Sequence, residues 1–303
     1  MAGKIRILVA YSGGKDSLAS LIWAVKKYGK EKVEAVFCDT KWEHELTYQH
    51  IKETTKKLGV KLTNLKAKNN NGFLDLAKLK KRFPSAKARF CTEHLKIRPM
   101  IDYILDQVKN HVIVIQGIRA DESISRSKMK ASCTYFRFYL EPYGYDAKGN
   151  PKFHTYRKKE VLAFVKKYMD DVIRPVFNWT AQEVLTYILE NGFKPNPLYY
   201  MGFARVGCMP CVMSGHNEIR QMIKHFPDHI KKLEQAEKKV ASTFFAPRYI
   251  PERFCTFISK AGKKLSSIKN VINYITKHKK KQHENRNEQQ ENNRCMSFYS
   301  ICE

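Results

Sequence analysis

The feature that most constrains the fold is a turn with two glycines near the start of the chain, between an aliphatic segment and an amphipathic one. The turn reads Ser12-Gly13-Gly14-Lys15-Asp16-Ser17. Residues 5–10 before it are mainly aliphatic or β-branched, which is typical of a buried parallel strand. After it, apolar residues recur at helical spacing until Gly29, where a helix is expected to end. In such a strand–turn–helix unit, backbone N–H groups and the helix N-terminus can bind phosphate.

The spacing of this turn separates it from two other phosphate-binding motifs. A Walker A loop has four residues between its first glycine and Gly-Lys, and the dinucleotide-binding motif reads GxGxxG. Neither pattern is present in the turn. The alternative of an ordinary surface loop fits less well with the strand before the turn and the helix after it. The sequence therefore predicts a phosphate site formed by Ser12, Gly13, Gly14, Lys15, Asp16 and Ser17.

Strands and helices alternate beyond the turn. A capping box formed by Thr180 and Glu183 marks the start of one helix. Pro99 requires a kink or a shifted boundary in another. The alternation predicts an α/β fold, an open sheet of five parallel strands with helices on both faces. The further strands are expected at Val33–Cys38, Val60–Leu65, Val112–Ile118 and Asp171–Phe177, and helices at about 44–58, Thr92–Lys109 and Lys158–Met169.

The remainder of the chain contains an insertion and a C-terminal region. Residues 131–157 are aromatic and rich in turn-forming residues, with a hairpin expected around 147–150. We predict one domain over residues 1–225, including this insertion, and a helical extension over 226–278. Residues 279–303 are polar and basic, which predicts a mobile tail.

The chain has an excess of positive charge that is not confined to one end. It holds 56 Lys and Arg against 29 Asp and Glu, a net charge of +27. Residues 1–223 hold 39 against 21, a net +18, and residues 224–303 hold 17 against 8, a net +9. Charge spread over the folded body predicts a polyanionic partner, and nucleic acid is the commonest. A basic surface that serves only solubility is the alternative.

The apolar segments and the cysteines predict the compartment. No segment reaches the ~20 apolar residues that a membrane span requires, and the first strand runs directly into the turn without a signal peptide. We expect a cytoplasmic protein with no membrane partner, in which the eight cysteines are thiols or metal ligands. The pair in Cys208-Met209-Pro210-Cys211 is by itself compatible with zinc, a redox pair, an iron–sulfur cluster or no metal.

Several segments, taken together, resemble one enzyme family over about residues 5–225. The turn Ser12–Ser17 resembles the pyrophosphate loop of the adenine nucleotide α-hydrolase superfamily. Other segments resemble those of phosphoadenylyl-sulfate (PAPS) reductases within this superfamily. These segments are Phe37–Glu43, Arg89–Pro99, Gly117–Arg126, Asn196–Tyr199 and Gly207–Cys211.

The resemblance implies an ATP pyrophosphatase that uses ATP and Mg²⁺ and adenylates its substrate. It implies that the six turn residues and Gly117 hold the phosphates and that Asp39 borders the nucleoside. Lys15, Asp16, Arg119 and Arg126 would be the catalytic residues. By spacing alone, the two arginines fit a phosphate clamp and a surface salt-bridge cluster equally well.

The resemblance also implies a [4Fe–4S] cluster, because adenylyl-sulfate (APS) reducing relatives hold one with a Cys-Cys pair and a later CxxC. The upstream pair here is Phe90-Cys91, so one ligand is missing. We predict Cys91, Cys208 and Cys211 as ligands, with Cys255 as the fourth. Cys133 in that role, or a cluster with only three cysteine ligands, are the alternatives, and a reduced CxxC without metal is a further one.

The C-terminus departs from the reductases, whose tail resembles Glu-Cys-Gly-x-His. Cys295 and Cys302 lack the neighbouring glycine and histidine. The layout is similar to DndC-type proteins of DNA phosphorothioation, so we expect sulfur insertion into nucleic acid, DNA being favoured over RNA, with a sulfur donor such as a cysteine desulfurase. A basic run beside Cys91, over residues 78–89, would contribute to binding. A PAPS or APS reductase, and a non-catalytic nucleic-acid-binding protein that keeps the nucleotide pocket, are the alternative functions.

Overall fold

The computed structural model describes residues 5–259 and 262–283, and the chain forms two compact units within them. The first unit comprises residues 5–38, 49–65 and 97–195, and the second comprises 39–48, 66–96, 196–259 and 262–283. Each unit is thus assembled from separate stretches of chain, and the boundary predicted after residue 225 falls inside the second unit. Residues 284–303 of the predicted tail lie outside the described residues.

The first unit is built on a six-stranded sheet with the order β3-β2-β1-β4-β8-β5. The first five strands in this order are parallel, and β5 pairs antiparallel with β8. The predicted open sheet of five parallel strands is therefore confirmed, and a strand from the insertion adds a sixth at one edge. The strands are β1 (Arg6–Ala10), β2 (Val33–Cys38), β3 (Lys61–Leu65), β4 (Val112–Gln116), β5 (Ser132–Thr134) and β8 (Asp170–Ile173).

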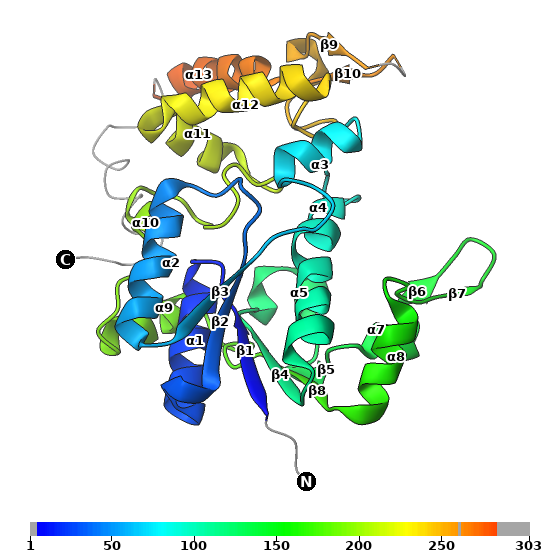
Figure 1. The fold of residues 1–303 in the computed structure, drawn as a ribbon. Coiled ribbons are helices and arrows are strands. Elements are labelled where there is room, and N and C mark those ends of the chain that lie inside the picture. Colours follow the sequence, from blue (N-terminus) through cyan, green and yellow to red (C-terminus); the bar gives the residue numbers. More distant parts are fainter. Residues whose placement is uncertain (1–4, 260–261, 284–303) are drawn as a thin grey trace. The chain divides into compact units, whose positions relative to one another are not determined.

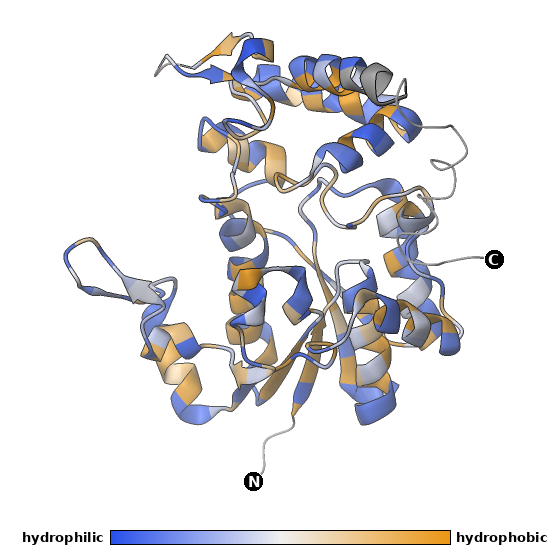
Figure 2. Ribbon diagram, turned by 180° about the vertical axis from the view of Figure 1, so that it is seen from behind, coloured by the Kyte–Doolittle hydropathy of each residue, from blue (hydrophilic) through white to orange (hydrophobic). Residues whose placement is uncertain are grey.

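Apolar side chains explain why the central strands lie inside the unit. Leu8, Val36 and Val114 are buried on three neighbouring strands and belong to one hydrophobic cluster. Figure 2 shows that the central strands of this sheet are hydrophobic along most of their length. This is the composition expected of parallel strands covered on both faces.

Helices cover both faces of the sheet (Figure 1). α1 and α9 lie on one face, and α5, α7 and α8 lie on the other, where they contribute Ile101, Tyr139 and Phe164 to the same buried cluster. α2 (Glu45–Leu58) starts in the second unit and ends in the first. The other helices of the first unit are α1 (Lys15–Tyr28), α5 (Arg98–Tyr103), α6 (Ile124–Ser127), α7 (Arg137–Leu140), α8 (Lys158–Lys167) and α9 (Ala181–Glu190).

The segment predicted as one helix over Thr92–Lys109 is a succession of helical pieces. α4 (Phe90–Thr92) and α5 are each followed by a π-helical turn, at Glu93–Ile97 and Ile104–Val108. Pro99 lies in the first turn of α5. A proline has no N–H to donate to the carbonyl one turn earlier in a helix. The wider π-helical turn before Pro99 accommodates this missing hydrogen bond, at the position where the sequence predicted a kink or a boundary.

Two local predictions of turn chemistry are confirmed. The insertion forms a hairpin of β6 (Gly144–Tyr145) and β7 (Pro151–Lys152). At the start of α9, the Glu183 N–H donates to the Thr180 hydroxyl over 3.2 Å, and the Thr180 N–H donates to the Glu183 carboxylate over 2.6 Å.

The second unit is mainly helical around an aromatic core. Trp42 stacks on Phe73 with 5.1 Å between ring centroids, and Phe83 meets Phe244 edge-on at 5.3 Å. None of the helices among the described residues combines the length and apolar character needed to cross a membrane. The elements are α3 (Phe73–Leu79), α4, α10 (Pro197–Tyr200), α11 (His216–His225), α12 (Pro227–Val240), α13 (Ile268–His283), β9 (Phe257–Ile258) and β10 (Lys264–Leu265).

Candidate functional site

The strand order places two loops at a topological switch point of the first unit. From β1 the chain builds β2 and β3 on one side of the sheet, and β4 pairs with β1 on the other side. Ligands of open α/β sheets bind beyond the carboxyl ends of the strands at such a point. The loop after β1 contains the glycine turn, and the loop after β4 begins with Gly117.

The glycine turn connects β1 to α1 as predicted. Gly13 has a φ of +75°, a conformation that favours glycine. The Ser17 hydroxyl donates to the Gly14 carbonyl over 2.9 Å, and its oxygen lies 3.3 Å from the Ser12 hydroxyl and accepts from the Ser12 N–H. In the described chain no side chain caps α1 at Gly14, so the helix N-terminus keeps its partial positive charge toward the turn.

Gly117 is required by the close approach of two backbone segments. A Cβ atom at this position would lie 2.5 Å from the Asp16 carbonyl carbon and 2.5 Å from the Ser17 nitrogen. Side chains other than hydrogen therefore do not fit between the end of β4 and the start of α1. The structure gives Gly117 a packing role beside the turn, and its predicted contact with phosphate stays a prediction.

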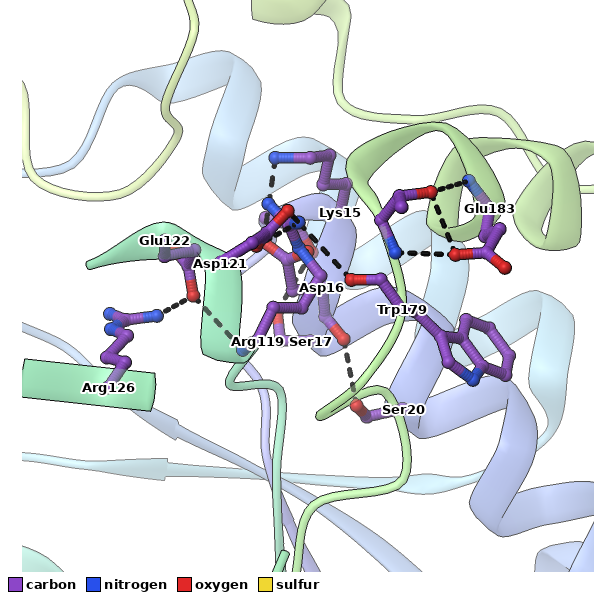
Figure 3. Close-up of polar contacts among 12 residues, drawn as sticks. Lys15, Asp16, Ser17, Ser20, Arg119, Asp121, Glu122, Arg126, Trp179 and Glu183 are labelled. Atoms are coloured by element: carbon purple, nitrogen blue, oxygen red, sulfur yellow. Dashed lines mark hydrogen bonds and ion pairs between the residues drawn. The ribbon is translucent and has the colours of Figure 1, made fainter. Parts of the chain in front are cut away.

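Arg119 is a buried cation held by carboxylates (Figure 3). Its Nε donates to Asp16 over 2.6 Å, and its Nη1 donates to both oxygens of Asp121. The backbone carbonyl of Trp179 lies 3.5 Å from the same Nη1. Burial acts to lower the pKa of Arg119, but Asp16 and Asp121 outweigh it and raise the pKa, so the charge is retained.

Lys15 is the second buried cation of the site. Its side chain is 6% exposed, and its Nζ lies 3.6 Å from the Asp16 carboxylate. Burial lowers the pKa of Lys15, and Arg119 lowers it further, while Asp16 opposes the shift. Asp16 thus touches both cations, which brings three of the four predicted catalytic residues together.

Arg126, the fourth predicted catalytic residue, is linked to Arg119 through Glu122. The guanidinium of Arg126 donates to Glu122, and the same carboxylate oxygen accepts from the Arg119 N–H over 3.2 Å. The sequence analysis included Asp121 and Glu122 only as part of the segment Gly117–Arg126 and gave them no role. Their place directly after Gly117-Ile118-Arg119 is the signal that would have found them.

Asp39, predicted to border the nucleoside, belongs to the second unit. Its carboxylate accepts from the Tyr48 hydroxyl and from the Lys41 N–H, each over 2.8 Å. These contacts order the segment after β2, and the nucleoside role stays a prediction.

Three of the predicted cluster ligands gather in the second unit. Burial raises the pKa of the Cys91 thiol, and the charge of Cys211 raises it further. Burial raises the pKa of Cys208 to about 12; Glu43 and Cys211 add to this rise, and Lys96 opposes it. Cys211 therefore lies within electrostatic reach of both other thiols.

Local contacts hold the loop of this cysteine group, Cys91, Cys208 and Cys211. Glu43 and Cys208 form an isolated antiparallel bridge, and the Met209 N–H donates to the Trp42 carbonyl over 2.7 Å. The Cys208 sulfur lies 3.6 Å from a Glu43 carboxylate oxygen and 3.5 Å from the Thr40 hydroxyl. The family resemblance included Glu43 and Thr40 in the segment Phe37–Glu43 but did not predict their contact with Cys208, about 165 residues later in the chain.

Cys255 and Cys133, the two candidates for a fourth ligand, have other contacts. The Cys255 thiol donates to the Pro251 carbonyl over 3.8 Å, and its pKa is raised by burial and by Glu252 and lowered by Lys264. Cys133 lies on β5 in the first unit, where its sulfur accepts from Arg174 over 3.6 Å. Cys295 and Cys302 lie outside the described residues.

The arrangement fits a single metal ion poorly. Among the residues that the structure describes, no three His, Cys, Asp or Glu side chains are placed to hold one ion. An iron–sulfur cluster spreads its thiolates around several metal atoms, so it requires cysteines that are near one another without converging on one point. The predicted cluster ligands Cys91, Cys208 and Cys211 stay a prediction at this point.

Most of the chain is similar to known proteins. The family model of the phosphoadenosine phosphosulfate reductase domain matches residues 6–214. An uncharacterized 37.8 kDa protein of Escherichia phage 186 is 30% identical over 299 residues, covering 81% of this chain and 80% of the phage protein. An uncharacterized protein of Methanocaldococcus jannaschii is 29% identical over 235 residues, covering 78% of this chain but only 42% of that longer protein.

The likeness to a named reductase is limited to a short segment. The adenosine 5'-phosphosulfate reductase of Streptomyces coelicolor is 46% identical over 39 residues, which is 13% of this chain and 16% of the reductase. The match establishes a shared motif but not a shared reaction.

Proposed function

The chain belongs to the phosphoadenosine phosphosulfate reductase domain family, and on that premise we propose that it cleaves ATP to AMP and pyrophosphate to adenylate a substrate. The observation that carries the proposal is the buried pair of Arg119 and Asp16, 2.6 Å apart, at the glycine turn. A structural salt bridge could form anywhere on the surface. This one lies at the switch point of the sheet, beside an uncapped helix N-terminus and a second buried cation.

The chemistry follows from the position of these charges. The N–H groups of the turn and the α1 N-terminus bind the β and γ phosphates of ATP. A substrate oxygen attacks the α phosphorus, the bond from that phosphorus to the bridging oxygen breaks, and pyrophosphate leaves. Lys15 and Arg119 stabilise the negative charge that develops on the departing oxygen. The substrate then carries AMP.

The charge balance of the site favours Mg²⁺ as a companion of ATP. The residues around the turn contribute as many carboxylates as cations, so a bare triphosphate would meet repulsion as well as attraction. Mg²⁺ is commonly held by one or two carboxylates together with substrate phosphates. Asp121, whose side chain is 53% exposed, is the carboxylate most open to such an ion.

The first test is the identity of the nucleotide product. With ATP labelled on the α phosphate, Mg²⁺ and a mixture of DNA and RNA oligonucleotides, we expect pyrophosphate and an equal amount of AMP, counted as free AMP and AMP attached to the oligonucleotides together. The products are separated by ion-exchange chromatography. ADP and phosphate as products would contradict the proposal, and absence of any turnover by a protein that still binds the oligonucleotides would favour the non-catalytic alternative.

We further propose that the adenylated substrate is nucleic acid and that AMP is displaced by sulfur at the oxidation level of sulfide. In that exchange a phosphorus– or carbon–oxygen bond to AMP is replaced by a bond to sulfur, with no net electron transfer. The net charge of +27 supports a polyanionic substrate, and the cysteine group supports sulfur chemistry. A donor such as a cysteine desulfurase, with its reductant, would supply the sulfide.

The cysteine group would hold an iron–sulfur cluster with three protein ligands. Such a cluster, when bound, supplies an iron atom with an open position for sulfide. Cys91, Cys208 and Cys211 would be the ligands, because a bound cation removes the mutual repulsion of neighbouring thiolates. Cys255, predicted from sequence as the fourth ligand, is tested beside these three.

Iron content tests this assignment. After anaerobic purification, we expect an absorbance band at about 400 nm and about four iron and four sulfide per chain. Cys208→Ser and Cys211→Ser should each lose most of the iron, whereas the matched control Cys255→Ser should keep it. Equal iron loss in Cys255→Ser would restore that residue as a ligand, and an iron-free wild-type protein that still forms AMP would overturn the cluster proposal.

Sulfonucleotide reduction is the second candidate, favoured by the 39-residue likeness to an adenosine 5'-phosphosulfate reductase. Release of sulfite from PAPS or APS in the presence of thioredoxin would support it. Cys302→Ser, a change outside the described residues, would then identify the reacting thiol.

A further inference from the structure

The insertion in the first unit carries three large aromatic side chains that are exposed to solvent. α7 and the β6–β7 hairpin expose Phe138 by 40%, Tyr143 by 52% and Tyr145 by 66%. Most large aromatic side chains in a folded protein are largely buried. In Figures 1 and 2 the hairpin projects beyond α7 and α8, away from the sheet.

The same segment has an ordered base, so the exposure is not a consequence of poor packing. Phe136 and Tyr139 are 1% and 5% exposed and lie in the core cluster, and the Tyr139 hydroxyl donates to the Tyr156 carbonyl over 2.7 Å. The His154 N–H donates to the Phe138 carbonyl over 2.9 Å. Tyr139 of α7 therefore anchors the insertion, while its neighbour Phe138 remains exposed.

The hairpin itself is held by its turn. The Asp146 carboxylate accepts from the Lys148 and Asn150 N–H groups over 2.8 and 2.9 Å, and the Tyr143 N–H donates to the Lys152 carbonyl over 2.9 Å. Tyr143 stacks on His154 with 5.0 Å between centroids and 25° between planes. The exposed tyrosine rings are therefore carried by a hairpin whose turn and strands are held by hydrogen bonds.

The insertion and its flanking residues have an excess of positive charge. Residues 128–159 contain eight Lys and Arg against two Asp and Glu. Both acids are engaged within the insertion, Glu141 with Arg137 and Asp146 with the turn. The exposed lysines of this stretch are Lys128, Lys130, Lys148, Lys152, Lys158 and Lys159.

We propose that this aromatic hairpin, residues 137–159, is a docking surface for single-stranded nucleic acid, with bases stacked on Tyr143 and Tyr145 and phosphates near Lys148 and Lys152. Stacking on exposed rings combined with backbone-directed cations is how proteins bind single strands without sequence preference. A duplex hides its base faces, so the surface favours single strands. The inference rests on the nucleic-acid substrate proposed above and assigns its docking site.

The test is fluorescence anisotropy of a fluorescein-labelled 20-nucleotide oligothymidine and of a 20-base-pair duplex with the full chain. The double variant Tyr143→Ala/Tyr145→Ala should raise the Kd for the single strand at least about fivefold. Tyr143→Phe/Tyr145→Phe keeps the rings and should bind like wild type. Leu189→Ala, 45% exposed in the same unit, is the matched control and should also bind like wild type.

The role of Lys148 and Lys152 is tested separately, by the salt dependence of oligonucleotide binding. Lys148→Glu/Lys152→Glu should lower the slope of log Kd against log salt by roughly 0.7 for each phosphate that the variant no longer neutralises. Thermal unfolding midpoints close to wild type would confirm that the variants fold. An unchanged Kd for the single strand in the tyrosine-to-alanine variant overturns the proposal. If that variant instead loses binding to phosphatidylglycerol vesicles while its oligonucleotide binding is unchanged, the occupant of the hairpin is a lipid surface and the proposal is also overturned.

The AMP assay separates this inference from the proposed function. Hairpin-dependent oligonucleotide binding without AMP formation would refute the proposed function and leave the docking surface intact. AMP formation together with oligonucleotide binding that does not depend on the hairpin would refute the docking surface and leave the proposed function intact.

Discussion

Replacement of Arg119 by alanine should lower kcat for ATP cleavage by at least about 100-fold, the usual effect of removing one preorganised donor from a site of developing negative charge. Arg119 is 5% exposed and donates to Asp16 and Asp121, so no neighbouring solvent-exposed cation can take its position. Arg119→Lys keeps the charge but not the planar fork, and should recover only part of the rate. Radiometric AMP formation under saturating ATP measures both effects.

The control for this prediction is Arg253→Ala, which removes an exposed arginine of the second unit. Its rate should match wild type. Because Arg119 is buried between carboxylates, its removal will also reduce stability, and thermal unfolding must be measured in parallel. A folded Arg119→Ala protein with a wild-type rate would show that the Arg119–Asp16 pair is only structural.

Gly117→Ala should disable the site by a different route. The new Cβ would lie 2.5 Å from backbone atoms of Asp16 and Ser17, so the turn and the end of β4 must move apart. We expect the free energy of unfolding to fall by about 1–3 kcal/mol, as for other overpacked sites. Displacement of the turn by a fraction of an ångström should lower the rate of AMP formation by at least about tenfold.

Gly144→Ala is the matched control, because a Cβ there meets no heavy atom within 4 Å. Its free energy of unfolding should stay within about 0.5 kcal/mol of wild type. Denaturant titration of the two variants compares them directly. Equal free energies of unfolding of Gly117→Ala and Gly144→Ala would show that the backbone segments at Gly117 are not closely packed. The rate of AMP formation by Gly117→Ala is compared with that of wild type, because Gly144 lies in the aromatic hairpin.

Local patterns predicted much of the first unit. The strand, turn and helix around Gly13, the capping box at Thr180 and the hairpin after Tyr145 each depend on residues a few positions apart, so composition and spacing sufficed. The alternation of strands and helices likewise predicted the five parallel strands. β5 was not predicted, because its three residues lie in an irregular insertion and gain their partner only from β8.

The set of cysteines that lie close together could not be predicted from local patterns. The prediction of Cys255 as the fourth ligand rests on its position outside residues 5–225, which carry the family resemblance. Position along the chain contains no information on the distance between two thiols. In the folded unit Cys211 raises the pKa of Cys91 and of Cys208, and the predicted ligand role of Cys255 stays a prediction. Glu43 and Thr40, which contact Cys208, carry no sequence signal that connects them to a CxxC.

The glycine turn itself, its strand and its helix were determined by the sequence, because their conformations are set by neighbouring residues and by glycine's lack of a side chain. Only the tertiary structure decided what surrounds the turn. Asp16 and Arg119 are 103 positions apart, and no periodicity indicates that one carboxylate would touch both Arg119 and Lys15. The parallel sheet brings them together, since it places the ends of β1 and β4 side by side.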